Sequence, residues 1–399
     1  MGIMLAAALW SCSDEDIPYN PTTEVCNRTV LVYISGETNL DDIIDSELYE
    51  MKEGSRLIGN NALLVYIDRA KKDELPYLAR IKQGEIIDST SIADMGISTK
   101  DEYSSDPNVM EGVIRYAFNT YKPVQDEYGL VLWGHASGWL LEDSVVYSAM
   151  GRRRAYGVDN GINSGSSTSG KWLNMPTLAK VLSKLPHLNF IFADCCNFQC
   201  LESAYELRNV TDYIIGSAAE IPDVGAPYNT VVPAMFDANF QTAIVDSYYA
   251  QTVAGCKVPL SVIKTEGMEE LASVTRSVLG TFAPELGQYP DMTGIIHYYY
   301  AYKFFDANDF IREHASAADY ANWKQAFDKV VVHKQMATQW LTNRNWGSYY
   351  NDFTVTEEKF GGVSMHIPQS PSSSNYSRYN ADIKHLGWYY AAGYADIGW

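Results

Sequence analysis

LNFIFADCCNFQC, residues 188–200, joins a mostly apolar run to three of the six cysteines of the chain. An apolar run without clear alternation is typical of a strand that is buried on both faces, as in a parallel sheet covered by helices. The helical pattern of LESAYEL, residues 201–207, follows at once. We therefore expect a strand that ends at Asp194, a short loop that carries the cysteines, and then a helix.

The same alternation of buried strand and helix recurs on both sides of this stretch. Further strands are expected at 28–35 (RTVLVYIS), 61–69 (NALLVYIDR), 128–134 (YGLVLWG) and 212–218 (DYIIGSA), and an antiparallel pair that turns at Gln83–Gly84 at 77–92. Helices are expected at 41–55, 107–118 and 175–185. This order predicts an α/β protein, an α/β/α sandwich with a mostly parallel sheet.

The pattern changes beyond about Lys264. Helices rich in Tyr and Phe are expected at 294–310 and 320–338, followed by a last strand at 361–368. We expect three regions: a signal and tether over 1–25, the main α/β domain over 26–265, and a helical C-terminal subdomain over 266–399 that packs on the sheet.

The N-terminus resembles an export signal. MGIMLAAALWSC is apolar and too short to span a bilayer, and a Cys after Leu-x-Ser resembles a bacterial lipobox, in which Cys12 is acylated. Residues 1–11 contain no Lys or Arg, which departs from a usual signal peptide, and an incidental cysteine in a disordered N-terminus is the alternative. We expect an exported protein, lipid-anchored to the outer membrane and displayed at the cell surface.

The charge of the chain limits its partners. A net charge of −19 repels a phosphate backbone and argues against nucleic acid. It favours cationic partners, such as calcium or peptides that carry Lys and Arg.

Two of the predicted strands end in residues that can perform chemistry. His135 follows 128–134 and Cys196 follows 188–194. Ligands of open parallel sheets bind outside the carboxyl ends of the strands, so an imidazole and a thiol should meet at one edge. Cysteine nucleophiles need such a base and backbone donors for the oxyanion.

Other interpretations of these residues stay open. A histidine after a strand is often structural, and Cys195, Cys196 and Cys200 could form a zinc or redox site. Adjacent cysteines close a tetrahedral site poorly, and the chain has no C-x-x-C pair, so a nucleophile with two neighbouring cysteines is the stronger hypothesis.

Six segments together resemble the clostripain family of cysteine peptidases, whose caspase-like fold is shared in outline with gingipains and legumain. They are TVLVYISGETNLDD, SDPNVMEGVIRYAFNTY, LVLWGHASGW, ADCCNFQCLESAYEL, EIPDVGAPY and GGVSMHIPQ, and they run in order through nearly all of the chain after the tether. The more specific parts are the W-x-H-G-x-G-W and D-A-C patterns. The resemblance implies a caspase-like α/β/α sandwich and a cysteine endopeptidase.

Carried onto this sequence, the resemblance makes His135 the catalytic histidine and Cys196, rather than Cys195, the nucleophile. It implies an oxyanion site from the backbone N–H groups of Ala136 and Cys196. It places Asp194 at the base of the S1 pocket. Asp223 falls at the rim, where the family often has glycine, and is either a second acid or an ordinary turn aspartate. Two residues depart from the family pattern: Ala136 replaces a glycine, where a Cβ could disturb an oxyanion donor, and Cys195 replaces an alanine.

The resemblance also implies substrates and processing. An acid in S1 selects peptides with P1 Arg, and less often Lys. Self-cleavage is expected at Arg152, Arg153 or Arg154, with a solvated basic loop as the alternative. The protein is accordingly expected to be a monomer or a processed pair of light and heavy chains. We expect no organic cofactor, and Ca²⁺ with ligands that the sequence does not identify. The rival function is an inactive, peptidase-like surface lipoprotein that binds peptides or proteins.

Overall fold

The structure is a computed structural model of the whole chain. It describes residues 26–71, 74–141, 156–161, 170–251, 257–299, 304–340, 344–345, 348–349, 353–371 and 374–399. The predicted acylation site at Cys12 and the predicted processing sites at Arg152, Arg153 and Arg154 lie outside these residues.

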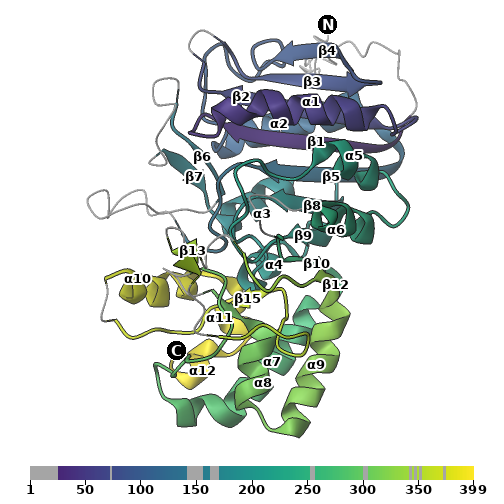
Figure 1. The fold of residues 1–399 in the computed structure, drawn as a ribbon. Helices are drawn as coiled ribbons and strands as arrows, with labels where there is room; N and C mark the ends of the chain where they lie inside the picture. Colours follow the sequence, from purple (N-terminus) through teal and green to yellow (C-terminus); the bar gives the residue numbers. More distant parts are fainter. Residues whose placement is uncertain are drawn as a thin grey trace, which may run out of the picture.

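One nine-stranded sheet runs through the molecule (Figure 1). In spatial order its strands are β12 (Val331–Gln335), β10 (Leu260–Lys264), β9 (Thr211–Gly216), β8 (Leu188–Asp194), β5 (Pro123–Trp133), β1 (Cys26–Gly36), β2 (Ala62–Arg69), β3 (Tyr77–Lys82) and β4 (Glu85–Ser91). The five central strands, from β9 to β2, pair in parallel, whereas both edges are antiparallel. The predicted α/β fold with a mostly parallel central sheet is confirmed.

Local sequence explains several of these elements. Residues 62–69 are all buried, as expected for a strand covered on both faces. The β3–β4 hairpin turns at Gln83 and Gly84, both of which have positive φ (51° and 90°), a conformation that glycine adopts without strain. Asp106 begins α2 by accepting hydrogen bonds from two backbone N–H groups of its first turn, with Pro107 directly after it.

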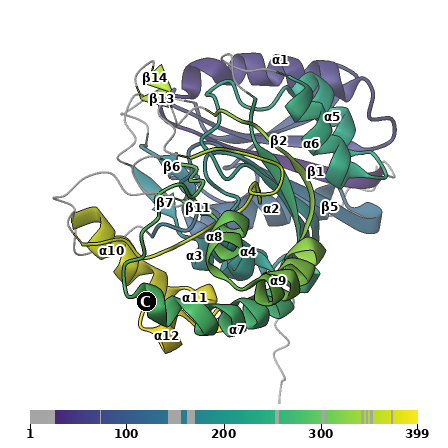
Figure 2. The ribbon, with the colours of Figure 1, turned by 60° about the horizontal axis from the view of Figure 1, so that its bottom comes forward.

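Helices cover both faces of the sheet (Figure 2). The helices on one face are α1 (Ile44–Ser55), α5 (Tyr228–Met235) and α6 (Phe240–Ala250), with η1 (Asp41–Ile43) before α1. Those on the other face are α2 (Pro107–Thr120), α3 (Met175–Leu182) and α4 (Leu201–Leu207). Each face has its own apolar core, because the side chains of a buried strand alternate between the two.

The C-terminal region packs below the sheet in Figure 1 and continues the core on the α2–α4 face. Its helices are α7 (Met268–Leu286), α8 (Ala307–His314), α9 (Ala317–Val330), α10 (Ser374–Asp382), α11 (Gly387–Ala391) and α12 (Tyr394–Ile397), with η2 (Thr265–Gly267) and η4 (Ile383–His385). Three small pairs complete the fold: β6 (Tyr156–Asp159) with β7 (Lys171–Leu173), β11 (Phe305–Asp306) with β15 (Ser364–Met365), and β13 (Arg344–Asn345) with β14 (Ser348–Tyr349).

Two of the helices predicted here are partly wrong. Within 294–310 only the part from Ala307 on is helical among the described residues, because the N–H of Asp306 bonds the carbonyl of Ile296 and holds these segments extended. Within 320–338 the helix ends at Val330, and the β-branched run that follows pairs with β10 as β12. The strand predicted over 361–368 is confined to Ser364–Met365.

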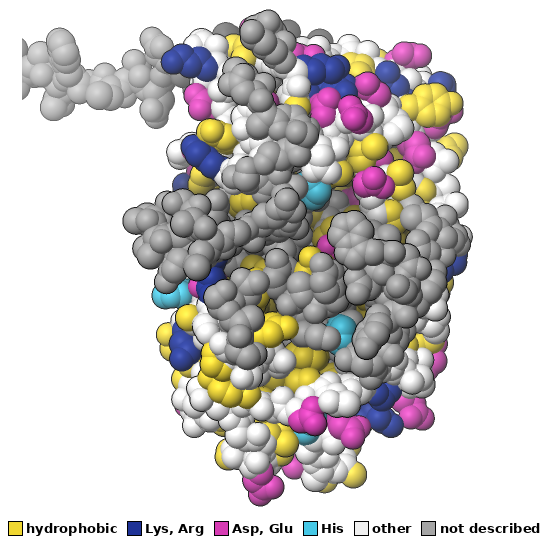
Figure 3. Space-filling view, turned by 60° about the vertical axis from the view of Figure 1, so that its left-hand side comes forward, with side chains coloured by type: hydrophobic (Ala, Val, Ile, Leu, Met, Phe, Trp, Pro, Cys, Tyr) yellow, Lys and Arg dark blue, Asp and Glu magenta, His cyan; other side chains and the backbone are white. Residues whose placement is uncertain are grey.

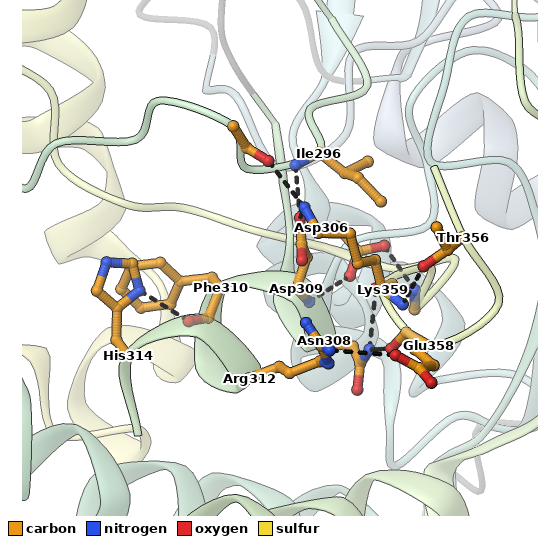
Figure 4. Close-up of polar contacts among 12 residues, drawn as sticks. Ile296, Asp306, Asn308, Asp309, Phe310, Arg312, His314, Thr356, Glu358 and Lys359 are labelled. Carbon is orange, nitrogen blue, oxygen red and sulfur yellow. Dashed lines mark hydrogen bonds and ion pairs between the residues drawn. The ribbon is translucent and has the colours of Figure 1, made fainter. Parts of the chain in front are cut away.

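A buried polar network ties the C-terminal loops to α8 (Figure 4). The Asp309 carboxylate accepts from the N–H of Ile296 at 2.9 Å and from the Lys359 ammonium at 3.2 Å. The Asn308 amide donates to the carbonyls of Glu358 and Lys359 at 2.8 and 2.9 Å. Hydrogen bonds to buried groups of this kind fix one arrangement of irregular backbone.

No helix among the described residues is long and apolar enough to cross a membrane. On the face in Figure 3 the acidic and basic side chains that are described lie interspersed, so the net charge is not gathered into one patch of those residues there.

Candidate active site

His135 and Cys196 leave adjacent parallel strands at the same level. Trp133 at the end of β5 is in register with Asp194 at the end of β8, and each candidate stands two residues beyond its strand end. Neighbouring strands are about 4.8 Å apart, so both loops begin at one point of the sheet edge. Both side chains are half-buried.

The two loops also contact each other. A Cβ added to Gly138 would lie 2.6 Å from the carbonyl oxygen of Asn197 and 3.3 Å from the sulfur of Cys200, so this close approach requires glycine. Asn197 itself has φ of 56°, an uncommon backbone conformation for a residue with a side chain. Its N–H and side-chain amide donate to the carbonyls of Ala219 and Ala218, which hold this turn directly after Cys196.

The three clustered cysteines have different surroundings. Cys195 and Cys200 are fully buried in the core of the α2–α4 face, and burial raises the pKa of both thiols well above the ordinary value. Cys196 packs against the opposite core and keeps part of its surface exposed. A thiol with a raised pKa stays protonated and unreactive, which leaves Cys196 as the accessible sulfur of the three. All three are free thiols.

The loop that carries Cys196 is held by the C-terminal region. The buried amide of Gln199 donates to the carbonyls of Ile214 and Ser261 at 3.1 and 2.9 Å, and the Gln199 carbonyl accepts from the N–H of Ser364 at 3.0 Å. The carboxylate of Glu202 accepts from the N–H of His366. Residues far along the chain therefore help to fix the turn after β8.

His135 has an orienting partner that the sequence did not reveal. The side-chain oxygen of Asn39 lies 2.9 Å from Nε2 of His135. An oxygen acceptor at Nε2 places the proton there, which leaves Nδ1 as the basic nitrogen. Asn39 lies beyond β1, the direct neighbour of β5. Its position past a central strand was the available signal, but an asparagine in a loop has many ordinary roles.

The backbone around Ala136 is suited to an oxyanion donor. The non-glycine residues with positive φ among those described are Gln83, Asp126 and Asn197, so Ala136 has an ordinary φ and its Cβ causes no strain of this kind. The N–H of Ala136 makes no hydrogen bond with a described residue. β6 holds this loop in place: Tyr156 forms a β-bridge with Ala136, and the N–H of Gly157 donates to the His135 carbonyl at 2.9 Å.

Asp194 is a buried acid two residues before Cys196 in the chain, and it is 2% exposed. Its Oδ2 accepts from the N–H of Ala226 at 3.0 Å and from the hydroxyl of Tyr228 at 2.8 Å. Its Oδ1 has no hydrogen-bond partner among the described residues. Burial raises the pKa of Asp194 to about 6, although both hydrogen bonds lower it.

Asp223 lies apart from this buried acid, in an exposed turn in which Gly225 donates its N–H to the Pro222 carbonyl. The carboxylate of Asp223 accepts from the N–H of the next residue, Val224, at 3.0 Å. Gly225 has φ of 60°, and a Cβ there would lie 2.9 Å from Oδ2 of Asp194. The turn that carries Asp223 therefore covers Asp194, while the Asp223 carboxylate itself faces solvent.

A sequence model of the clostripain family matches residues 32–399, nearly the whole described chain. The chain belongs to the clostripain family. The predicted family and its caspase-like architecture are thereby confirmed, and the chain is a member of a family of cysteine peptidases.

Solved structures of other members cover almost the same length. A secreted C11 cysteine protease from Bacteroides thetaiotaomicron, in complex with an irreversible peptide inhibitor, is 30% identical with a TM-score of 0.71, over 93% of this chain and 99% of that one. An inactive zymogen C11 protease from Parabacteroides distasonis is 27% identical with a TM-score of 0.72, over 92% and 98%. No match was found among curated proteins.

A candidate metal centre lies at the same sheet edge of this clostripain-family chain. Glu37, Asp68 and Asp101 each bring one carboxylate oxygen within 4.8 Å of the others. The three clustered cysteines are not among the groups of metal-ligating side chains found in the described part of the chain, which removes the support for a zinc site there.

Proposed function

We propose that this protein is a cysteine endopeptidase that cleaves after Arg, and less readily after Lys. The observation that carries the proposal is Asp194, a buried carboxylate with one oxygen left without a partner, two residues before the partly exposed Cys196. A guanidinium presents several N–H donors in a fixed fork, so it satisfies a buried carboxylate better than an ammonium does.

In the proposed reaction, Nδ1 of His135 takes the proton of the Cys196 thiol, and the thiolate attacks the carbonyl carbon after the P1 Arg. The carbonyl electron pair moves to oxygen, where the N–H groups of Ala136 and Cys196 stabilise the charge. The pair returns, the C–N bond breaks, and His135 gives its proton to the leaving amine. Water, deprotonated by His135, attacks the thioester carbonyl. The C–S bond then breaks, the Cys196 thiolate takes the proton back from His135, and the carboxylic acid product leaves.

We also propose self-processing at Arg152, Arg153 or Arg154. In the sequence Arg154 stands two residues before Tyr156, which pairs with Ala136 beside the catalytic histidine. One similar protein is described as an inactive zymogen, which supports an activation step in this chain as well. The product is a light and heavy chain that stay associated, since β6 belongs to the same core as β1.

We propose that the protein is exported and held at the outer membrane by acylation of Cys12. The lipobox-like sequence before Cys12 supports this, as does the description of a similar protease as secreted. Labelling of cells with a palmitate analogue tests it: a Cys12→Ser variant must lose the label, and a label retained by that variant contradicts acylation at this position.

The experiment that tests the activity compares the parent with Cys196→Ala and Cys195→Ala on peptides that end in P1 Arg, Lys and citrulline. We expect Cys196→Ala to be inactive and to stay as one chain, while Cys195→Ala cleaves Arg peptides. Residual Arg-peptide cleavage by Cys196→Ala would sink the assignment. A parent that is correctly folded, calcium-supplied and still inert would favour the rival function, a peptide-binding surface lipoprotein.

A further inference from the structure

Three carboxyl groups that meet beside the candidate active site have buried oxygens with no hydrogen-bond partner among the described residues. Glu37 follows β1, Asp68 is the penultimate residue of β2, and Asp101 lies in the loop before α2. Glu37 is 1% exposed, Asp68 is fully buried and Asp101 is half-buried. One oxygen from each lies within 4.8 Å of the other two.

The side chains within hydrogen-bond reach of Glu37 and Asp68 among the described residues are themselves acids: Asp159 for both, and Asp101 for Glu37. Both carboxylate oxygens of Glu37, both of Asp68 and one of Asp101 are buried and accept no hydrogen bond from an amide, ammonium or hydroxyl group of the described residues. Buried carboxyl groups are normally paired, hydrogen-bonded or bound to a cation, because desolvation of an isolated charge is costly. Burial, followed by the effect of Asp159, raises the pKa of both Glu37 and Asp68, as expected for acids gathered without a counter-charge.

A fourth acid, Asp159, differs from these three because both of its carboxylate oxygens accept hydrogen bonds from donors nearby. Its Oδ2 accepts from the hydroxyl of Ser104 at 2.8 Å, and its Oδ1 accepts from the N–H of Gly161 at 2.8 Å. Asp159 ends β6, and the next residue, Asn160, donates its N–H and its side-chain amide to the Glu37 carbonyl at 3.1 and 3.0 Å. The bare oxygens therefore lie where β6 joins the loop after β1.

From this geometry we infer that Glu37, Asp68 and Asp101 bind one Ca²⁺ ion. All of the donors are hard oxygens, which suit Ca²⁺ and Mg²⁺ and not zinc or copper. Ca²⁺ contacts oxygens at about 2.3–2.6 Å, so ligands on opposite sides of the ion can lie about 4.8 Å apart. Mg²⁺ needs a smaller octahedral shell and keeps its water, which a fully buried Asp68 cannot accommodate well.

The site has a structural consequence for the active-site edge. The ion joins β2 to the loop after β1, and that loop carries Asn39, the partner of His135. It also neutralises the acids against which Asp159 and β6 pack, and β6 supports the His135 carbonyl through Gly157. Bound Ca²⁺ should therefore order β6 and this loop together.

The test uses the full chain with Cys196→Ala, so that neither binding nor processing depends on the proposed peptidase activity. After chelation and removal of the chelator, Ca²⁺ and Mg²⁺ are titrated by calorimetry, and the Tm is measured with each. We expect one Ca²⁺ site with a Kd of about 10⁻⁶ to 10⁻³ M, at least about tenfold weaker binding of Mg²⁺, and a Tm that rises with Ca²⁺.

Two variants in this background make the test specific. Asp68→Asn should lose the Ca²⁺ heat and the Ca²⁺-dependent rise in Tm, while its metal-free Tm stays the same or increases because one buried charge is gone. Asp94→Asn, the same change at an exposed acid of the turn after β4, should behave like the parent. Hydrogen exchange of the N–H groups of Gly157 and Asn160 should slow when Ca²⁺ binds.

Four results would overturn the inference. They are a parent that binds no Ca²⁺ at millimolar concentration, Asp68→Asn that binds as the parent does, Mg²⁺ that binds as tightly as Ca²⁺, and bound Ca²⁺ that leaves both the Tm and the exchange of β6 unchanged. Because the measurements use an inactive chain, they can fail while the peptidase stands, and the reverse.

Discussion

Asp194 at the sheet edge and Asp306 in the C-terminal region are two buried aspartates in similar surroundings. They differ in the hydrogen bonding of one carboxylate oxygen. Each accepts from a tyrosine hydroxyl, Tyr228 for Asp194 and Tyr298 for Asp306, and each also accepts from backbone N–H groups. Burial raises the pKa of both to about 6. Only Asp194 keeps an oxygen without a partner among the described residues.

The donors around Asp306 account for the difference. Its Oδ2 accepts from Tyr298 and from the N–H groups of Gly361 and Gly362, and its Oδ1 accepts from the N–H of Asp309 (Figure 4 shows Asp306 within this network). Asp306 is complete without a ligand, as expected of an acid that organises loops. Asp194, equally buried but with a bare oxygen, is where we propose that the P1 cation binds.

The same substitution in both places should have opposite effects, and this is the largest change we expect. Asp194→Asn should lower kcat/KM for Arg peptides on the order of 10² to 10³-fold, because the P1 cation loses a buried charged partner. Asp306→Asn should leave kcat/KM per folded molecule nearly unchanged. Active-site titration with a thiol-reactive probe provides the count of folded, competent molecules.

Stability should change the other way. The oxygen of an asparagine at 194 can face Ala226 and Tyr228 while its amide takes the place of Oδ1, which faces no donor among the described residues. At 306 both oxygens face N–H donors, so an amide must oppose at least one of them, which should cost about 1–3 kcal/mol. Chemical unfolding measures both variants. A destabilised Asp194→Asn with normal activity would make Asp194 a structural acid like Asp306.

At acidic pH the cleavage of Arg peptides should slow because Asp194 becomes protonated. The pKa of about 6 lies above the ordinary value, so the carboxyl is protonated, and unable to pair with a cation, as the pH falls below about 6. We expect kcat/KM for Arg peptides to fall about tenfold for each pH unit below 6, since kcat/KM reports the free enzyme. A matched P1 citrulline peptide is neutral, so its kcat/KM should not show this fall below pH 6. If kcat/KM for both peptides falls in the same way, the fall is due to a group other than Asp194.

The raised pKa also has a stability consequence. The unfolded chain releases this proton near its ordinary pKa, so it binds fewer protons than the folded chain between about pH 4 and 6. Ionisation of Asp194 therefore destabilises the free protein as the pH rises through that window, and the cost is complete above 6. Asp194→Asn should remove this part of the pH dependence of unfolding.

A smaller effect is expected at Asn39. Like Asp306, and unlike Asp194, this residue has a side chain of the protein itself as its partner. Asn39→Ala removes the acceptor at Nε2 of His135, so the imidazole loses its fixed tautomer. We expect kcat to fall about 10- to 100-fold with KM little changed, as for other orienting partners of reactive imidazoles. Asn39→Asp should restore part of the rate. A change confined to KM would instead make Asn39 a substrate contact.

The central sheet could be predicted from the sequence because its strands are continuous apolar runs, and the run that ends at Asp194 was placed to the residue. The ends of adjacent parallel strands meet by geometry, so the positions of His135 and Cys196 followed from the same pattern. The bare oxygens could not be predicted, because Asp194 and Asp306 both follow apolar residues. Their difference depends on donors that lie 32 and 55 residues away.

The C-terminal elements were predicted incorrectly for a related reason. The segment that ends in β12 reads as one helix, because its Tyr, Trp and Phe have helical spacing up to Val330. Only the partner strand β10, about 70 residues earlier in the chain, makes Val331 extended. Local propensity decides such a segment only when no long-range pairing competes with it.

The smallest effect should come from Ala136→Gly, which restores the family residue. Ala136 has an ordinary φ and its N–H has no hydrogen bond to a described residue, so the Cβ does not stop the backbone from acting as an oxyanion donor. We expect kcat/KM to change by less than about threefold, with stability lower by about 0.5–1 kcal/mol because glycine gains freedom when unfolded. Steady-state kinetics and unfolding on the same preparation give both numbers. A tenfold gain in kcat/KM would show that the Cβ disturbs the donor, and the departure from the family pattern would then weaken catalysis at an otherwise complete site.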